Sequence, residues 1–194
     1  VRAAWPAGAR PANCRLGVDA AGSMTDGDKI GHARQGLRRF LREFSPRDRV
    51  GLMIFDSDIR SVVPIAPMAH NGALLRNSVD QLVAANSTAL YDATSAGWQA
   101  VDRLHDDTRI NAVVILSDGA DTASRLHTQL GGVLAPLQAR ANGEGRQIRI
   151  FTIAYGSDAN SDVLAKIAAA SGGEAYSGDP KTIEKVYLQI SSFF

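Results

Sequence analysis

The stretch RLGVDAAGSM, residues 15–24, changes abruptly at Asp19 from an apolar run to small and polar residues. An apolar run of this kind is typical of a strand buried on both faces of a parallel sheet. In an open parallel sheet, ligands bind in the crevice outside the carboxyl ends of the strands. The stretch therefore predicts a parallel strand that brings Asp19, and then Ser23, to the ligand-binding edge of a sheet.

The rest of the chain alternates between strand-like runs and helical patterns. Buried parallel strands are predicted at residues 15–19, 50–55, 112–116 and 148–154. In FDSDIRSVVPI, residues 55–65, two extended pieces meet at residues 56–58, which predicts a hairpin. Pro64 has no backbone N–H to donate, so we expect the second strand of this hairpin at the edge of the sheet.

One amphipathic helix is predicted from apolar residues spaced by three and four, namely Ile30, Ala33, Leu37, Leu41 and Phe44. Thr25 followed by Asp28 resembles a capping box at its start, and Ser45-Pro46 marks its end. Further helices are predicted near residues 71–83, 89–104, 123–141, 161–170 and 180–191. This alternation predicts a doubly wound, Rossmann-like α/β fold with a mostly parallel sheet, one antiparallel edge strand and helices on both faces.

The length and composition suit one domain. We expect a lead-in linker at residues 1–12 and a single domain at 13–194, as part of a longer protein because the chain begins with Val1. The 21 basic and 20 acidic side chains nearly cancel, which argues against a nucleic-acid partner. No apolar run is long enough for direct membrane insertion. Cys14 is the only cysteine, so an internal disulfide is excluded and a buried, inert thiol is expected.

Three predicted loops at the carboxyl edge of the sheet are rich in oxygen-bearing side chains. Carboxylates and hydroxyls without His or Cys suit Mg²⁺, Mn²⁺ or Ca²⁺. Each group also has an ordinary interpretation as a turn or a helix cap, but their meeting at one edge favours a shared cation site. The candidates are Asp19, Ser23, Thr25 and Asp26 in the first loop, Asn86, Ser87, Thr88 and Asp92 in the second, and Ser117, Asp118, Asp121 and Thr122 in the third.

Three motifs, VDAAGSM, STALYDA and VVILSDGADT, resemble the von Willebrand factor type A domain with its metal-ion-dependent adhesion site. The resemblance covers about residues 13–190 and implies a twisted six-stranded sheet. It also implies that one divalent cation, Mg²⁺ or else Mn²⁺ or Ca²⁺, is bound by loop oxygens, and that an Asp or Glu of a protein partner completes its coordination. Matched residue by residue, the metal site consists of Asp19, Ser23, Thr88 and Asp118.

Ala21 departs from the pattern, because the family has a serine at this position. Loss of one ligand hydroxyl should weaken the metal by a factor on the order of 10–100 unless water replaces it. One interpretation is therefore a weakly held cation. In another, the domain has lost its metal and acts as an interaction scaffold, or the alanine is an introduced change.

The resemblance implies a non-enzymatic protein–protein interaction or adhesion domain, without catalytic residues, as a monomer or part of a larger multidomain chain. An extracellular or bacterial cell-surface location is expected, and a cytoplasmic one is the alternative. Two other functions stay open. One is a metal-independent assembly scaffold that uses the arginine face of residues 34–42; the other is a metal-assisted phosphohydrolase, for which the chain lacks the usual phosphate-binding and nucleophile motifs.

Overall fold

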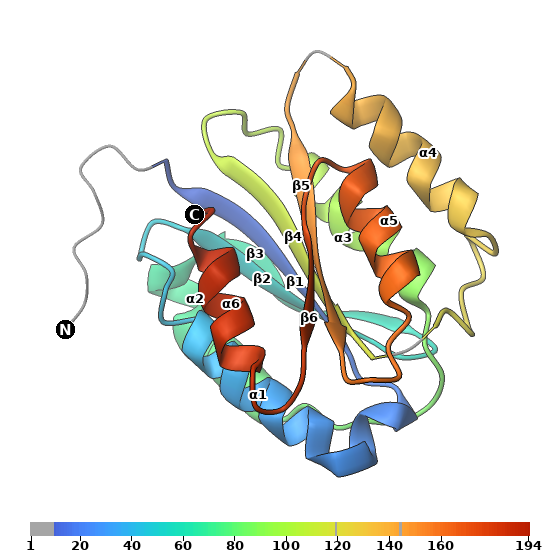
Figure 1. The fold of residues 1–194 in the computed structure, drawn as a ribbon. Coiled ribbons are helices and arrows are strands. Elements are labelled where there is room, and N and C mark those ends of the chain that lie inside the picture. Colours follow the sequence, from blue (N-terminus) through green and yellow to red (C-terminus); the bar gives the residue numbers. More distant parts are fainter. Residues whose placement is uncertain (1–9, 119, 144) are drawn as a thin grey trace.

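The computed structural model describes residues 10–118, 120–143 and 145–194. Within these residues, six strands form one sheet in the order β3-β2-β1-β4-β5-β6 (Figure 1). The strands are β1 Ala12–Asp19, β2 Arg49–Phe55, β3 Ile59–Pro67, β4 Ile110–Ser117, β5 Ile148–Tyr155 and β6 Ala175–Gly178. The helices are α1 Lys29–Phe40, α2 Met68–Asp80, α3 Leu90–Asp102, α4 Leu130–Ala141, α5 Ser161–Ala170 and α6 Ile183–Ser191, with a 3₁₀ segment at Gly22–Asp28. Residues 1–9 of the predicted linker lie outside the described part, and β1 begins at Ala12.

The chain changes direction across the sheet between β1 and β4. From β1 it continues to β2 and β3 on one side, and it then crosses to β4, β5 and β6 on the other. The pair β2–β3 is antiparallel, whereas the other neighbours are parallel. The predicted doubly wound sheet with one antiparallel edge strand is thus confirmed. The carboxyl ends of β1 and β4 flank the point where the strand order reverses, which is the usual ligand position in such sheets.

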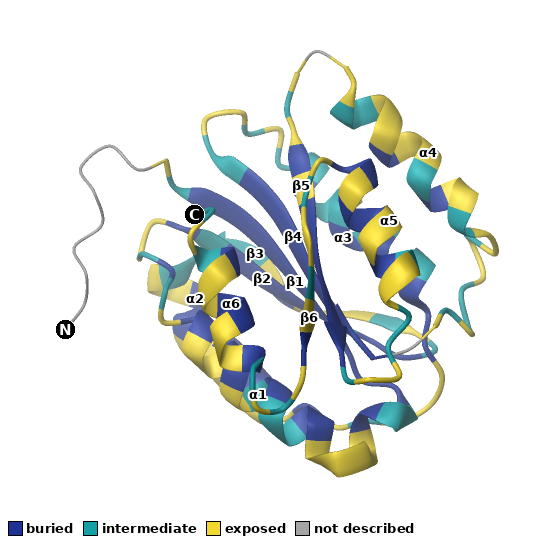
Figure 2. Cartoon of the chain, in the orientation of Figure 1, coloured by how far each residue is buried: buried dark blue, intermediate teal, exposed yellow. Residues whose placement is uncertain are grey.

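Helices cover both faces of the sheet (Figure 1). Helices α1, α2 and α6 contribute to one apolar core, and α3, α4 and α5 contribute to the other. The central strands are buried along their length, while the helices expose their outer sides (Figure 2). In the described part of the chain, no helix has the length and apolar character that crossing a membrane requires. The sheet is therefore a rigid platform for the loops at its ends.

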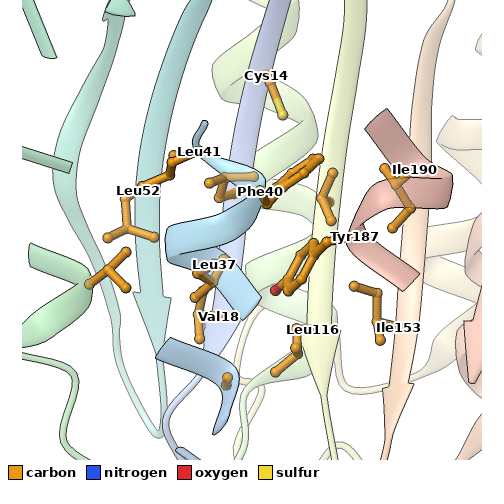
Figure 3. Packing of buried hydrophobic residues seen from close by; sticks show 14 of the residues in the cluster. Cys14, Val18, Leu37, Phe40, Leu41, Leu52, Leu116, Ile153, Tyr187 and Ile190 are labelled. Carbon is orange, nitrogen blue, oxygen red and sulfur yellow. The ribbon is translucent and has the colours of Figure 1, made fainter. Parts of the chain in front are cut away.

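Helix α1 is the predicted amphipathic helix, and it packs against α6 (Figure 3). The five apolar residues that define its pattern are all buried, but α1 ends at Phe40, before the predicted end at Ser45-Pro46, so that Leu41 and Phe44 lie after the helix. The Phe40 ring stacks on the Tyr187 ring of α6 with centroids 4.9 Å apart. Gly36 allows this approach, because a Cβ there would lie 3.1 Å from the Tyr187 ring. Cys14 is buried in the same core, as predicted, and burial raises the pKa of its thiol above its usual value.

Two further local predictions about helix ends are wrong. Thr25 and Asp28 form no capping box, because the Thr25 hydroxyl donates to the Gly22 carbonyl at 2.7 Å and Asp28 adopts a positive φ of 56°. Helix α4 begins at Leu130 and not near residue 123. Residues 125–127 donate their backbone N–H groups to the Asp92 carboxylate, which holds this segment in a loop.

The packing of α6 on α1 predicts a large loss of stability when the Tyr187 ring is removed. Tyr187→Ala should lower the free energy of unfolding by about 3–5 kcal/mol, because it deletes a buried ring and leaves a cavity. Leu188→Ala on the same helix is the control, since Leu188 is 38% exposed, and should cost roughly 1 kcal/mol or less. Denaturant unfolding measures both values, and equal losses would contradict the described packing.

Candidate functional site

Four buried aspartates organise the loops at the carboxyl edge of the sheet. Asp19 ends β1, Asp56 follows β2, Asp118 follows β4 and Asp92 lies in the first turn of α3. Each is less than a tenth exposed. Because a buried carboxylate without partners costs several kcal/mol, each one accepts hydrogen bonds from the loops around it. These bonds draw together segments that are distant in sequence.

Asp19 joins the first loop to the end of β4. One carboxylate oxygen accepts the Ala21 N–H at 2.9 Å, and the other accepts the Ser117 hydroxyl at 2.5 Å. Burial raises the pKa of Asp19 to about 7, and the charges of Asp118 and Asp56 add to this, although the two hydrogen bonds oppose it. Asp19 is thus a buried structural carboxylate with both oxygens engaged.

Asp118 joins the first loop to the third. One of its oxygens accepts the Ser23 hydroxyl at 2.8 Å, and the other lies 2.7 Å from the Lys29 ammonium. The same ammonium lies 2.9 Å from both oxygens of Asp158, in the loop after β5. Burial opposes a charged Lys29, but its hydrogen bonds and ion pairs with the two aspartates outweigh this effect and raise its pKa. The hydrogen bond from Lys29 lowers the pKa of Asp158.

Thr88, the predicted ligand from the second loop, is buried and connected through its main chain. Its carbonyl accepts N–H groups from Thr122 and Ala123 at 2.8 and 2.9 Å, and its N–H donates to the Thr122 hydroxyl at 3.0 Å. The first and second loops meet where Gly22 N–H donates to the Asn86 carbonyl at 2.9 Å. The three predicted loops therefore do converge. In the described residues, side-chain hydrogen bonds join Ser23 to Asp118 and Ser117 to Asp19, whereas Thr88 contacts the third loop through its backbone.

Asp92 has a different role from the other candidates. Its carboxylate accepts the backbone N–H groups of Arg125, Leu126 and His127 at 2.7, 3.1 and 2.8 Å, and His127 Nδ1 lies 3.0 Å away. The Leu126 side chain is 85% exposed on this pinned segment. Asp92 thus holds the third loop in a fixed shape and presents Leu126 to solvent.

The remaining predicted oxygens serve the loops or face solvent. Asp121 accepts the Tyr91 N–H at 3.0 Å and the Ser124 hydroxyl at 2.5 Å. Asp26 is exposed, and the backbone N–H of Ser87 donates to the Ser57 hydroxyl at 3.2 Å. These groups therefore follow the ordinary turn and loop interpretation.

Sequence reasoning missed Lys29, Asp56 and Asp158. Asp56 directly follows β2 and Asp158 lies three residues after β5, so the rule that selected the first three loops also applies to them. Lys29 lies at the start of the predicted helix, where a charged residue is ordinarily solvated. No sequence pattern marks it as a buried ion-pair partner.

The residues present fit a divalent cation only in part. Four oxygen-bearing side chains of the predicted set remain, but Ala21 supplies no hydroxyl. In the described part of the chain, no three His, Cys, Asp or Glu side chains form a group that holds a metal, so a cation would depend on Ser23 and Thr88. Lys29 already provides a positive charge to Asp118 at contact distance. The arrangement as it stands therefore does not suit a divalent ion at Asp118.

A hollow of about 430 Å³ lies at the opposite edge, near the amino ends of β4 and β5. Its lining is rich in arginine and includes Arg109, Arg146 and Arg149. It is far from the converging loops in the topology of the sheet. The candidate site is thus a surface of loops that are held in place by hydrogen bonds to buried aspartates. Such a surface suits contact with a macromolecule more than enclosure of a small ligand.

Comparison with known proteins agrees with this geometry. The family described as von Willebrand factor type A domain matches residues 16–187. Inter-alpha-trypsin inhibitor heavy chain H4 of Homo sapiens is 26% identical over 174 residues, which is 85% of this chain and 18% of that protein. The Bos taurus protein of the same name is 26% identical over 172 residues, again 85% of this chain and 18% of that protein. The chain therefore spans about a fifth of the length of these curated relatives.

Solved structures share the fold at low identity. A von Willebrand factor type A protein from Catenulispora acidiphila superposes with a TM-score of 0.78 at 17% identity, over 96% of this chain and 46% of that one. Proximal thread matrix protein 1 from the mussel byssus, described with a zinc-occupied metal-ion-dependent adhesion site, gives a TM-score of 0.70 at 16% identity, over 94% and 46% of the two chains. The family often binds a divalent cation at a metal-ion-dependent adhesion site.

Asp92 should be needed for the shape of the third loop. Asp92→Ala removes the acceptor of three backbone N–H groups, and we expect a loss of about 2–3 kcal/mol in the free energy of unfolding. Hydrogen exchange at Arg125, Leu126 and His127 should become faster. Asp26→Ala, which changes an exposed carboxylate of the first loop, should leave these amides unchanged.

The contribution of Asp92 should also depend on pH. Burial would raise its pKa, but the hydrogen bonds from residues 125–127 outweigh burial and hold the pKa below its usual value of 3.8. A carboxylate with a lowered pKa stabilises the fold above its unfolded value and loses this effect as pH falls through the folded value. The stability difference between the wild type and Asp92→Ala should therefore be full at neutral pH and shrink below about pH 4. A constant difference from pH 7 to pH 3 would show that the charge of Asp92 is not responsible.

Proposed function

Since the chain belongs to the von Willebrand factor type A family, whose domains typically mediate adhesion and protein interaction and are generally non-catalytic, we propose that it binds a protein partner through the loops at the carboxyl edge of its sheet. The proposed surface consists of the first loop around Ser23, the hairpin turn at residues 56–58 and the third-loop segment 125–127. The expected extracellular or bacterial cell-surface location stays a prediction.

The observation that carries this proposal is the pinned, exposed third loop. A single exposed leucine is ordinary on a protein surface. Leu126 differs because the Asp92 carboxylate fixes the backbone on both sides of it. A contact group held in one conformation loses less entropy on binding than a mobile one. Beside it, Arg125 and Asp58, each more than two-thirds exposed and 3.8 Å apart, offer charged groups at the rim.

The geometry does not favour the phosphohydrolase alternative. A nucleophilic carboxylate must reach its substrate, but Asp19 is fully buried and both its oxygens accept hydrogen bonds. The ammonium of Lys29 is engaged by two aspartates.

The arginine face of α1 also favours the loop edge over a scaffold that uses this helix. Arg34 donates to the Leu82 carbonyl, and Arg38 pairs with Asp80 at 2.5 Å. Part of the arginine face is therefore occupied by the chain itself, which leaves fewer free charges for an acidic partner.

The predicted divalent cation at Asp19, Ser23, Thr88 and Asp118 is not required by the proposed function. The ion pair between Lys29 and Asp118 weighs against it, because a divalent ion at Asp118 has to displace the ammonium or share the carboxylate with it. A partner Asp or Glu that completes a metal shell stays a prediction together with the cation. The proposal depends only on the loop surface.

Site-specific photo-crosslinking tests this proposal. A photoreactive residue at position 126 should form a covalent adduct with a partner protein in extracts of the source cells, whereas the same residue at Gln147, exposed at the opposite edge, should not. With the partner then identified and purified, Leu126→Asp should weaken binding by at least about tenfold, or 1.4 kcal/mol. Gln147→Asp should leave the affinity unchanged. A partner whose affinity is lowered by Gln147→Asp and not by Leu126→Asp would contradict the proposed surface.

A further inference from the structure

We propose that the ammonium of Lys29 is the resident cation of this loop cluster and takes the place of a divalent metal. The inference goes beyond the proposed function, since it concerns what holds the loops together and not which partner they contact. Lys29, a residue of the chain itself, is then the source of positive charge at the carboxyl edge of the sheet.

The contacts of Lys29 are those of a bridging cation. Its Nζ lies 2.7 Å from Asp118 and 2.9 Å from each oxygen of Asp158. These contacts connect the first turn of α1 with the loops after β4 and β5. Three N–H groups thus meet three carboxylate oxygens, which uses the whole donor capacity of an ammonium. A single positive centre ties together three segments that are far apart in sequence.

Burial increases the contribution of the Lys29–Asp118 ion pair to stability. The side chain of Asp118 is fully buried and that of Lys29 is 10% exposed, whereas Asp158 is 54% exposed. An exposed pair contributes little because water and salt screen it. A buried carboxylate, in contrast, requires a compensating charge or several hydrogen bonds. For Asp118 these are the Lys29 ammonium on one oxygen and the Ser23 hydroxyl on the other.

The main chain leaves room for this lysine at Gly156. Gly156 has a φ of +96°, which side-chain-bearing residues rarely adopt, and a Cβ there would lie 3.0 Å from Lys29 Cε and 2.9 Å from an Asp158 oxygen. The absence of a side chain at this position thus allows the loop after β5 to close over the lysine. The lysine therefore lies in a close-fitting site formed by its neighbours.

Ala21 is consistent with the same conclusion. It is buried, and its N–H donates to Asp19, so the first loop is ordered at this position without a hydroxyl. A site that depends on a metal would lose affinity with each missing ligand. A site whose charge comes from Lys29 has no such need. The Lys29 ammonium at Asp118 and the missing hydroxyl at Ala21 thus have one physical explanation.

Competition for the site can be measured in variants that restore the missing hydroxyl. Calorimetric titration with Mn²⁺ should show binding at least about tenfold tighter to Ala21→Ser/Lys29→Met than to Ala21→Ser alone. Lys185→Met, combined with Ala21→Ser, is the control, because Lys185 is exposed on α6, and it should bind like Ala21→Ser. Equal Mn²⁺ affinity of Ala21→Ser and Ala21→Ser/Lys29→Met would overturn the proposal.

The wild type provides a test that does not depend on the folding of any variant. The Lys29 ammonium should give a protected ¹⁵N signal in NMR spectra, because its protons are buried and hydrogen-bonded. This signal and the melting temperature should stay unchanged in millimolar Mn²⁺ compared with a salt of equal ionic strength. Saturable Mn²⁺ binding that broadens the Lys29 signal and raises the melting temperature would show that a metal, and not Lys29, is the cation. Neither result depends on the presence of a protein partner.

Discussion

The burial of carboxylates at the end of the sheet is the constraint on which the loop architecture depends. A carboxyl group removed from water must find N–H groups, hydroxyls or a cation close by. Asp19, Asp92 and Asp118 each accept a hydrogen bond from a residue that is distant in sequence, namely Ser117, Arg125 and Ser23 respectively. The apolar layers fix the strands and helices, whereas the carboxylates fix the connections between them. The hydrogen bonds that compensate the buried carboxylates therefore also order the loops.

Much of the fold could be predicted from the sequence because strand burial and helix periodicity are local signals. The four parallel strands, the antiparallel edge strand and the apolar stripe of α1 were all predicted from runs and spacings, and the structure confirms them. The error at the start of α4 occurs because a distant residue decides local structure. Residues 123–129 have a helical pattern, but Asp92, about thirty positions earlier, engages the backbone of 125–127. A local sequence pattern contains no information about a hydrogen bond to so distant a residue.

For the candidate site too, local sequence signals and contacts between distant residues contribute differently. Carboxyl-end polarity predicted that Asp19, Ser23 and Asp118 lie at one edge of the sheet, where Ser23 donates to Asp118 and Ser117 donates to Asp19. The role of Lys29 could not be predicted in this way, because a lysine at the start of a helix is ordinarily solvated. Only its distance from Asp118 and Asp158 shows otherwise. Polarity therefore locates a site, while the pairing within it depends on three-dimensional packing.

Lys29 is also the first residue of α1, and this position has a mechanical consequence. Twelve residues of helix form a rod of about 18 Å. One end of the rod is anchored by charge to the loops after β4 and β5, and at the other end Phe40 lies against the Tyr187 ring of α6. A helix held at both tips cannot slide along its axis without disturbing one of these attachments. Helix α1 thus connects the loop edge and the last helix as one rigid element.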